Sequence, residues 1–233
     1  MKIGFDQNVS FDIRIRIIIR AFLFLGLMFV VIFVSAGRWD YWQGWLSFLL
    51  FIYTYLFSSI LIPSDLLQER FKPGPGTKKW DYIFLSFYIP LLYMTPLIAA
   101  LDGGRYHWTT VFPQWINVFA FVIVFLGYTL VTLSIWANQF FSTRVRIQKE
   151  RGHFVIDKGP YAFIRHPGYT GGIISSFSIA IGLNSLWALI PAGLYSILLI
   201  TRTILEDATL HKELPGYADY SSRVKYRLLP GIW

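Results

Sequence analysis

Residues 167–201, PGYTGGIISSFSIAIGLNSLWALIPAGLYSILLIT, form a run of 35 residues without a charged side chain. One helix of that length would measure about 52 Å, far more than the ~30 Å hydrocarbon core of a bilayer. Gly182, Asn184 and Ser185 lie near the centre of the run and are residues that favour turns. The run therefore predicts two antiparallel helices that cross the membrane and return.

The predicted hairpin places residues from its two ends at the same membrane face. Arg165 and His166 precede the run, whereas Arg202 and Glu206 follow it on one face of the emerging helix. We expect these four side chains to be neighbours. Taken alone, Arg202 and Glu206 would form an ordinary exposed ion pair, worth about 0.3–0.5 kcal/mol. Likewise, Arg165 and His166 alone would be interfacial residues that contact lipid head groups.

The composition points to an all-α, polytopic integral membrane protein. Hydrophobic residues make up 55% of the chain and charged residues only 15%, too few to cover a soluble globule of 233 residues. Outside the hairpin, four further apolar runs are expected to be transmembrane helices: 21–36, 42–62, 82–101 and 115–137. Together with the two helices of the hairpin, they make about six. The chain has no cysteine, which excludes disulfides and cysteine nucleophiles.

The predicted spans divide the chain into two regions. Residues 1–114 form an amino-terminal region of three spans, and residues 115–233 contain span four, the connector 139–166, the hairpin and a cytoplasmic tail. An amphipathic lead, 1–20, precedes the first span, for which a cleavable signal peptide is the alternative. A polar connection, 102–114, is expected to follow the third span.

The positive charges predict the orientation. All lysines and arginines except Arg38 and Arg105 lie on one side of the predicted spans. Because cytoplasmic loops are enriched in these residues, both termini and the candidate site are expected to be cytoplasmic. The net charge of +8 is thereby explained without a nucleic-acid partner.

Irregular backbone is expected where the connector enters the hairpin. Gly159 and Pro160 form a turn, and Pro167 disfavours helical geometry at His166. At membrane depth, such backbone is tolerated only where protein or a water-filled cavity covers it, so its amides can face a polar ligand. A purely structural role is the alternative. No metal site is expected, because His153 and His166 have no accompanying ligand motif.

These motifs carry a resemblance to a known family. The chain resembles the isoprenylcysteine carboxyl methyltransferases and, more loosely, the phospholipid methyltransferases, over residues 136–233. The matching motifs are Gly159-Pro160-Tyr161, Arg165-His166-Pro167-Gly168-Tyr169-Thr170-Gly171, Arg202-xxx-Glu206-Asp207-xx-Leu210, Tyr217-xx-Tyr220 and Arg227-Leu228-Leu229-Pro230.

The resemblance implies S-adenosylmethionine as the methyl donor. It implies that Arg202 is the catalytic residue that binds the substrate carboxylate, and that Asp207 replaces a second family glutamate. Gln148 matches a family glutamine only with a two-residue difference in spacing. Including Gln148, the implied cofactor-binding residues are Gln148, His153, Phe154, Val155, Ile156, Tyr161, His166, Pro167, Gly168, Tyr169 and Glu206.

The expected function is methyl transfer to a lipophilic or membrane-partitioned acceptor, with carboxyl O-methylation of an isoprenylcysteine-like substrate as the leading hypothesis. The expected partners are membrane lipids and a lipophilic or prenylated substrate, whereas oligomeric state stays open. The alternatives are a lipid-amine or phospholipid N-methyltransferase, a nicotinamide-dependent membrane reductase and a non-enzymatic scaffold. The reductase gains no support from the sequence, because no Gly-x-Gly-x-x-Gly motif is present.

Overall fold

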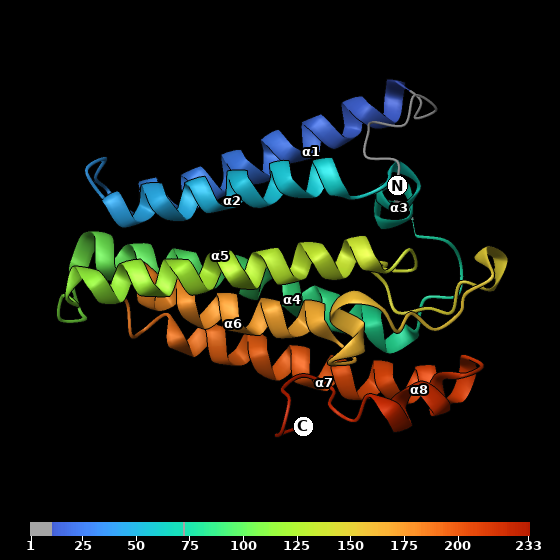
Figure 1. Cartoon of the computed structure of the whole chain (residues 1–233). Helices are drawn as coiled ribbons and strands as arrows, with labels where there is room; N and C mark the ends of the chain where they lie inside the picture. Colours follow the sequence, from blue (N-terminus) through green and yellow to red (C-terminus); the bar gives the residue numbers. More distant parts are fainter. Residues whose placement is uncertain (1–10, 72) are drawn as a thin grey trace.

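The structure, a computed structural model, describes residues 11–71 and 73–233 as a bundle of helices running side by side (Figure 1). The first half of the expected amphipathic lead lies outside the described residues. The principal helices are α1 (Phe11–Phe29), α2 (Trp42–Leu61), α3 (Ser64–Phe71), α4 (Lys79–Ala99), α5 (Gln114–Ala137), α6 (Pro167–Gly182), α7 (Leu189–Glu213) and α8 (Tyr217–Arg223). Short π-helices extend α1 over Val30–Val34 and α4 over Ala100–Tyr106, and 3₁₀ turns occupy Lys149–Arg151 and Gly159–Ala162.

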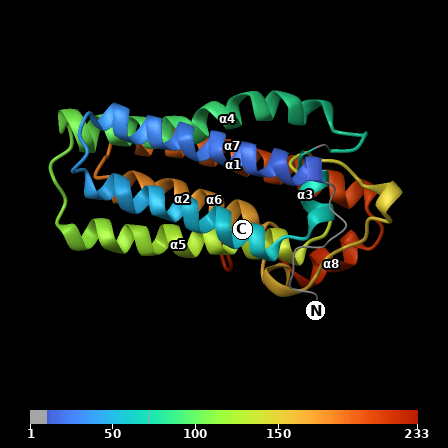
Figure 2. The ribbon, with the colours of Figure 1, turned by 90° about the horizontal axis from the view of Figure 1, so that it is seen from above.

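The all-α polytopic architecture is confirmed. Four helices are long and apolar enough to cross a membrane, judged by length and composition: Trp42–Leu61, Lys79–Tyr106, Gln114–Ala137 and Leu189–Glu213. Ile18–Val34 is a shorter apolar helix, and α6 has 16 residues. Seen from above, α4 and α5 lie on opposite edges of the bundle (Figure 2).

The predicted hairpin is present as α6 and α7, which lie side by side and antiparallel in both views (Figures 1 and 2). Asn184 turns the chain in the left-handed conformation, with φ of 62°, which asparagine adopts more readily than most residues. Its side-chain oxygen accepts a 2.7 Å hydrogen bond from the Phe112 amide. Tyr41 donates a 2.6 Å bond to the Leu183 carbonyl. The turn is therefore held by both amino-terminal and central segments.

Two sequence-based boundaries were wrong. The expected connection from Asp102 is helical as far as Tyr106, because the buried Asp102 carboxylate is satisfied by protein rather than by water. It accepts hydrogen bonds from the Thr109 amide at 2.7 Å, the Thr109 hydroxyl at 2.6 Å and the Ser185 hydroxyl at 2.6 Å. The first helix also reaches back to Phe11 and thus includes half of the expected lead.

Helices α5 and α6 pack through glycines. A Cβ atom built on Gly171 would lie 2.5 Å from the Gly127 carbonyl oxygen, and one on Gly127 would lie 2.2 Å from the Ser175 hydroxyl. Small residues let helix backbones approach in this way. The close approach fixes the position of the first turn of α6, which contains Tyr169 and directly follows His166.

We expect Gly171→Ala to destabilise the protein by about 1–3 kcal/mol, the usual cost of overpacking a core. The matched control is Gly193→Ala in α7, where an added Cβ has no atom within 4 Å and should be neutral or stabilising by up to about 1 kcal/mol. Thermal unfolding in detergent compares the two variants. Equal effects would contradict the packing role of Gly171.

Candidate active site

The connector closes one end of the bundle and is bonded to α3 and to the loop that follows it. Arg146, whose side chain is fully buried, forms a two-pronged ion pair with Glu69 at 3.0 Å and donates to the Pro75 carbonyl at 3.1 Å. The Lys78 amide donates to the Val145 carbonyl at 3.0 Å. These bonds hold an irregular segment that has little repetitive structure of its own.

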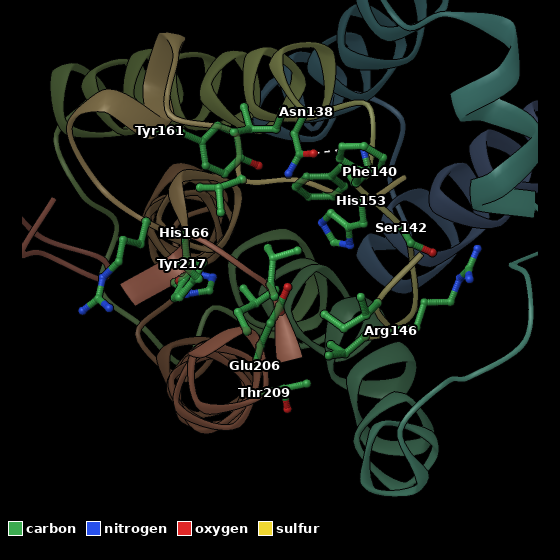
Figure 3. Close-up of a pocket in the computed structure, with 18 of the residues that line it drawn as sticks. Asn138, Phe140, Ser142, Arg146, His153, Tyr161, His166, Glu206, Thr209 and Tyr217 are labelled. Atoms are coloured by element: carbon green, nitrogen blue, oxygen red, sulfur yellow. Dashed lines mark hydrogen bonds between the residues drawn. The ribbon is translucent and has the colours of Figure 1, made fainter. Parts of the chain in front are cut away.

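A pocket of about 90 Å³ lies between the connector, α6 and α7. Figure 3 shows Asn138 and Tyr161 on one side of it, Glu206 and Thr209 on the opposite side, and His153 between them. The sequence-predicted residues on its wall are His153, Phe154, Val155, Ile156, Tyr161, His166, Gly168, Tyr169 and Glu206. The structure thus brings together residues from Asn138 to Tyr220 around one small space.

Two predicted cofactor residues are not part of this wall. The fully buried Gln148 donates a 2.6 Å hydrogen bond to the Phe140 carbonyl and accepts a 2.7 Å bond from Arg151, so its side chain shapes the connector. Pro167 is buried as the first residue of α6, where its fixed φ suits a helix start. Its contribution is to begin the helix that presents Gly168 and Tyr169.

The sequence interpretation missed several wall residues. Asn138, Arg146 and Thr209 line the pocket. Asn138 and Arg146 have no motif or period that marks them, whereas Thr209 lies three residues after Glu206 on the same face of α7. Tyr217 also lines the pocket and was quoted only as part of a closing motif. Helical spacing from Glu206 could not reveal Tyr217, because α7 ends at Glu213 and the chain turns before α8 begins.

Asp207, rather than Glu206, is the centre of the buried polar network. Its carboxylate accepts two bonds from Arg165, at 2.9 and 3.0 Å, one from Arg227 at 2.9 Å and one from Tyr217 at 2.7 Å. His166 Nε2 lies 3.4 Å from the same carboxylate. Three chain segments, the connector, α7 and the tail, therefore meet at one side chain.

Glu206 and Arg202 lie on one face of α7, but their side chains line different cavities. Glu206 lines the pocket and accepts a hydrogen bond from the Tyr169 hydroxyl. Arg202 is buried and forms an ion pair with Asp81 at 2.9 Å, and it donates to the Thr143 carbonyl at 3.0 Å. The alternative of an exposed Arg202 to Glu206 surface pair is therefore wrong.

Arg202 lines a second and larger cavity, of about 600 Å³, within the helices. Its wall is mainly apolar, with side chains from α1, α2, α4, α5, α6 and α7. Gly168 and Tyr169 line both spaces. The small polar pocket and the large apolar cavity therefore adjoin at the first turn of α6.

The His153 ring is in a position that disfavours its charged form. It stacks on Phe140 with ring centroids 4.4 Å apart, and its Nδ1 accepts a 3.3 Å bond from the Gln148 amide. Burial, followed by the charges of Arg146 and Arg151, lowers the pKa of His153 from 6.5 to about 4. The imidazole is consequently neutral at pH 7.

This pKa predicts a pH dependence of stability. Between pH 6.5 and about 4 the unfolded chain binds a proton at His153 that the folded chain does not, so stability is lost as pH falls through this window. The His153→Asn variant, whose side-chain oxygen retains an acceptor for the Gln148 amide, should show a shallower loss. Melting temperatures measured across the window test this. Identical slopes for both proteins would refute the assignment.

The chain is similar to known proteins in two comparisons. The model of the isoprenylcysteine carboxyl methyltransferase (ICMT) family matches residues 116–212, which include α6 and nearly all of α5 and α7. Protein-S-isoprenylcysteine O-methyltransferase B of Arabidopsis thaliana is 29% identical over 144 residues, which are 60% of this chain and 70% of the plant protein. Over residues 116–212, the chain is therefore similar to the isoprenylcysteine carboxyl methyltransferase family.

Proposed function

We propose that the protein transfers a methyl group from S-adenosylmethionine to the carboxylate of an isoprenylcysteine-like lipophilic acceptor. The observation that carries this proposal is the junction of two unlike spaces at Tyr169. One is polar and contains Glu206, and the other is apolar and contains Arg202. A water-soluble donor and a lipid-like acceptor can each enter a space of matching chemistry and meet there.

The residues of the small pocket fit S-adenosylmethionine. Phe140, Phe154 and Tyr161 offer aromatic surface for an adenine ring, and Glu206 can accept from the donor's amine or hydroxyl groups. Arg165 Nε is buried and has no hydrogen-bond partner among the described residues, so it can donate to the donor's carboxylate. When bound, the donor supplies an electrophilic methyl group on a sulfonium.

The residues of the large cavity fit an anionic lipid. Phe24, Met28 and Leu92 are among its apolar walls. Arg202 Nε is buried without a hydrogen-bond partner among the described residues, so it can donate a charged hydrogen bond to a carboxylate. A carboxylate is already a nucleophile and needs no general base. Positioning and exclusion of water are therefore the main contributions expected of the protein.

We further propose the orientation and the division of labour. Both termini and the small pocket face the cytoplasm, residues 115–233 bind the donor, and residues 1–114 contribute walls to the acceptor cavity. In sealed right-side-out vesicles, terminal tags should be protected and a tag inserted at Asp40, in the turn before α2, should be accessible. Termini found on opposite faces would contradict the proposal.

Separate titrations of the purified protein with S-adenosylmethionine and NADPH test the function, followed by incubation with labelled donor and N-acetyl-S-farnesylcysteine. We expect binding of S-adenosylmethionine and base-labile label on the acceptor, as for a methyl ester. Label on phosphatidylethanolamine instead would indicate the lipid-amine alternative. Binding of NADPH alone would indicate a reductase, and binding of neither would indicate a scaffold.

A further inference from the structure

The large cavity is positively charged at one end. Three arginines, Arg70, Arg144 and Arg202, are among its lining residues, and no aspartate or glutamate lines it in the part of the chain that the structure describes. Thr143 lies between two of them, since its hydroxyl donates to the Arg70 carbonyl at 3.2 Å and its carbonyl accepts from Arg202 at 3.0 Å. This end of the cavity is suited to an anion.

The three arginines differ in how their charge is balanced. Arg202 is paired with Asp81 at 2.9 Å, and the Arg144 guanidinium lies over the Tyr82 ring, 4.6 Å from its centroid. Arg70 forms no ion pair with any described residue, because the neighbouring Glu69 carboxylate is already bound by Arg146 through two bonds of 3.0 Å. Of the three, only Arg202 therefore has a carboxylate partner among the described residues.

The Arg70 guanidinium is also poorly solvated. It lies over the Phe141 ring, 5.3 Å from the centroid, and its Nη1 atom is buried without a hydrogen-bond partner among the residues described. Burial lowers the pKa of Arg70, as does the charge of Arg202 nearby. A buried cation without a partner costs several kcal/mol. Such a cost is recovered when a ligand brings the missing anion.

We propose that Arg70 is a second anion-binding residue of the acceptor cavity, which receives the acceptor's anionic group between its guanidinium and that of Arg202. This inference rests on the proposed function. It names a residue that makes the cavity prefer acceptors with a negative charge. Arg202, already held by Asp81, orients the group, whereas Arg70 supplies positive charge that no described carboxylate balances. The cavity therefore selects anionic lipophiles over neutral ones of the same shape.

Binding of two matched probes to the purified full-length protein tests this. N-acetyl-S-farnesylcysteine carries a carboxylate, and its carboxamide has nearly the same shape without the charge. We expect the wild-type protein to bind the carboxylate about 10- to 100-fold more tightly, the scale of a charged hydrogen bond. Arg70→Met, which keeps an unbranched side chain against Phe141, should reduce this preference to within about threefold while leaving the dissociation constant for S-adenosylmethionine unchanged.

Control variants separate this role from a structural one. Lys212→Gln removes a charge from an exposed position of α7 and should keep the full preference. Without ligand, Arg70→Met should melt at the same temperature as the wild type or higher, because an unpaired buried charge has been removed. Should Arg70→Met fail to fold, Arg70→Gln and Arg70→Lys replace it, and only the lysine variant should keep part of the preference.

A wild-type preference retained in the neutral Arg70 variants would overturn the inference. If those variants retain the preference while the wild type methylates the carboxylate probe, only the role of Arg70 fails. If the wild-type protein neither distinguishes the two probes nor transfers a methyl group to the carboxylate, the proposed function itself fails.

Discussion

Asp207→Asn is expected to lower the free energy of unfolding by about 3–5 kcal/mol, the cost of breaking a buried charge network from one side. The carboxylate is 1% exposed and is bonded to Arg165, Arg227 and Tyr217. Asparagine has nearly the same shape but no charge, so both arginines would lose their counter-ion. Equilibrium unfolding in detergent measures the effect.

Asp219→Asn is the matched control for this loss. Asp219 lies exposed on α8, where the same chemical change should alter stability by less than about 0.5 kcal/mol. The Asp207 variant should also weaken binding of S-adenosylmethionine, because His166 and Arg165 lie on the pocket wall and contact Asp207. Equal stability of the two variants would show that the network is redundant.

The hairpin could be predicted because its signals are local. An uncharged run too long for one span, with Asn184 and Ser185 at its centre, leaves few other arrangements, and Pro167 marks the start of a helix. Each of these signals depends on neighbouring residues or on the thickness of a bilayer. The juxtaposition of His166 with the residues after Arg202 followed from the same reasoning.

The ion pairs of the site could not be predicted in this way. Asp81 lies 121 residues before Arg202, its partner, and no sequence pattern links the two. Asp207 was interpreted as a conservative replacement beside Glu206, although the helical twist turns the two adjacent carboxylates into different surroundings. Glu206 meets the pocket and Tyr169, whereas Asp207 meets the arginines of the connector and tail.

The connector shows the same limit at the level of a single side chain. Gln148 has a polar side chain near the right position for cofactor binding, yet it is used to hold Phe140 and Arg151. A segment without helical or strand periodicity gives no rule for the direction in which a side chain points. Only the three-dimensional course of residues 138–166 decides which residues face the pocket.

Arg202→Lys and Glu206→Gln should separate by role, because the two side chains face different spaces. Glu206→Gln keeps the shape and removes the charge, so we expect the dissociation constant for S-adenosylmethionine to rise by about 10- to 100-fold. Arg202→Lys keeps a cation beside Asp81 but loses the planar fork. It should spare donor affinity and slow the single-turnover rate on a carboxylate acceptor by about 1–3 kcal/mol in activation free energy.

Arg223→Lys is the matched control for the second change. Arg223 forms an ion pair with Asp157 at 3.2 Å in which its side chain is 64% exposed, and exposed pairs contribute about 0–1 kcal/mol. Donor affinity and single-turnover rate should therefore stay close to wild type in this variant. If Arg202→Lys behaves like Arg223→Lys, Arg202 is only the structural partner of Asp81. If Arg202→Lys and Glu206→Gln both weaken binding of S-adenosylmethionine, the small pocket and the large cavity act as one binding site. Tyr169 would then not separate the donor from the acceptor.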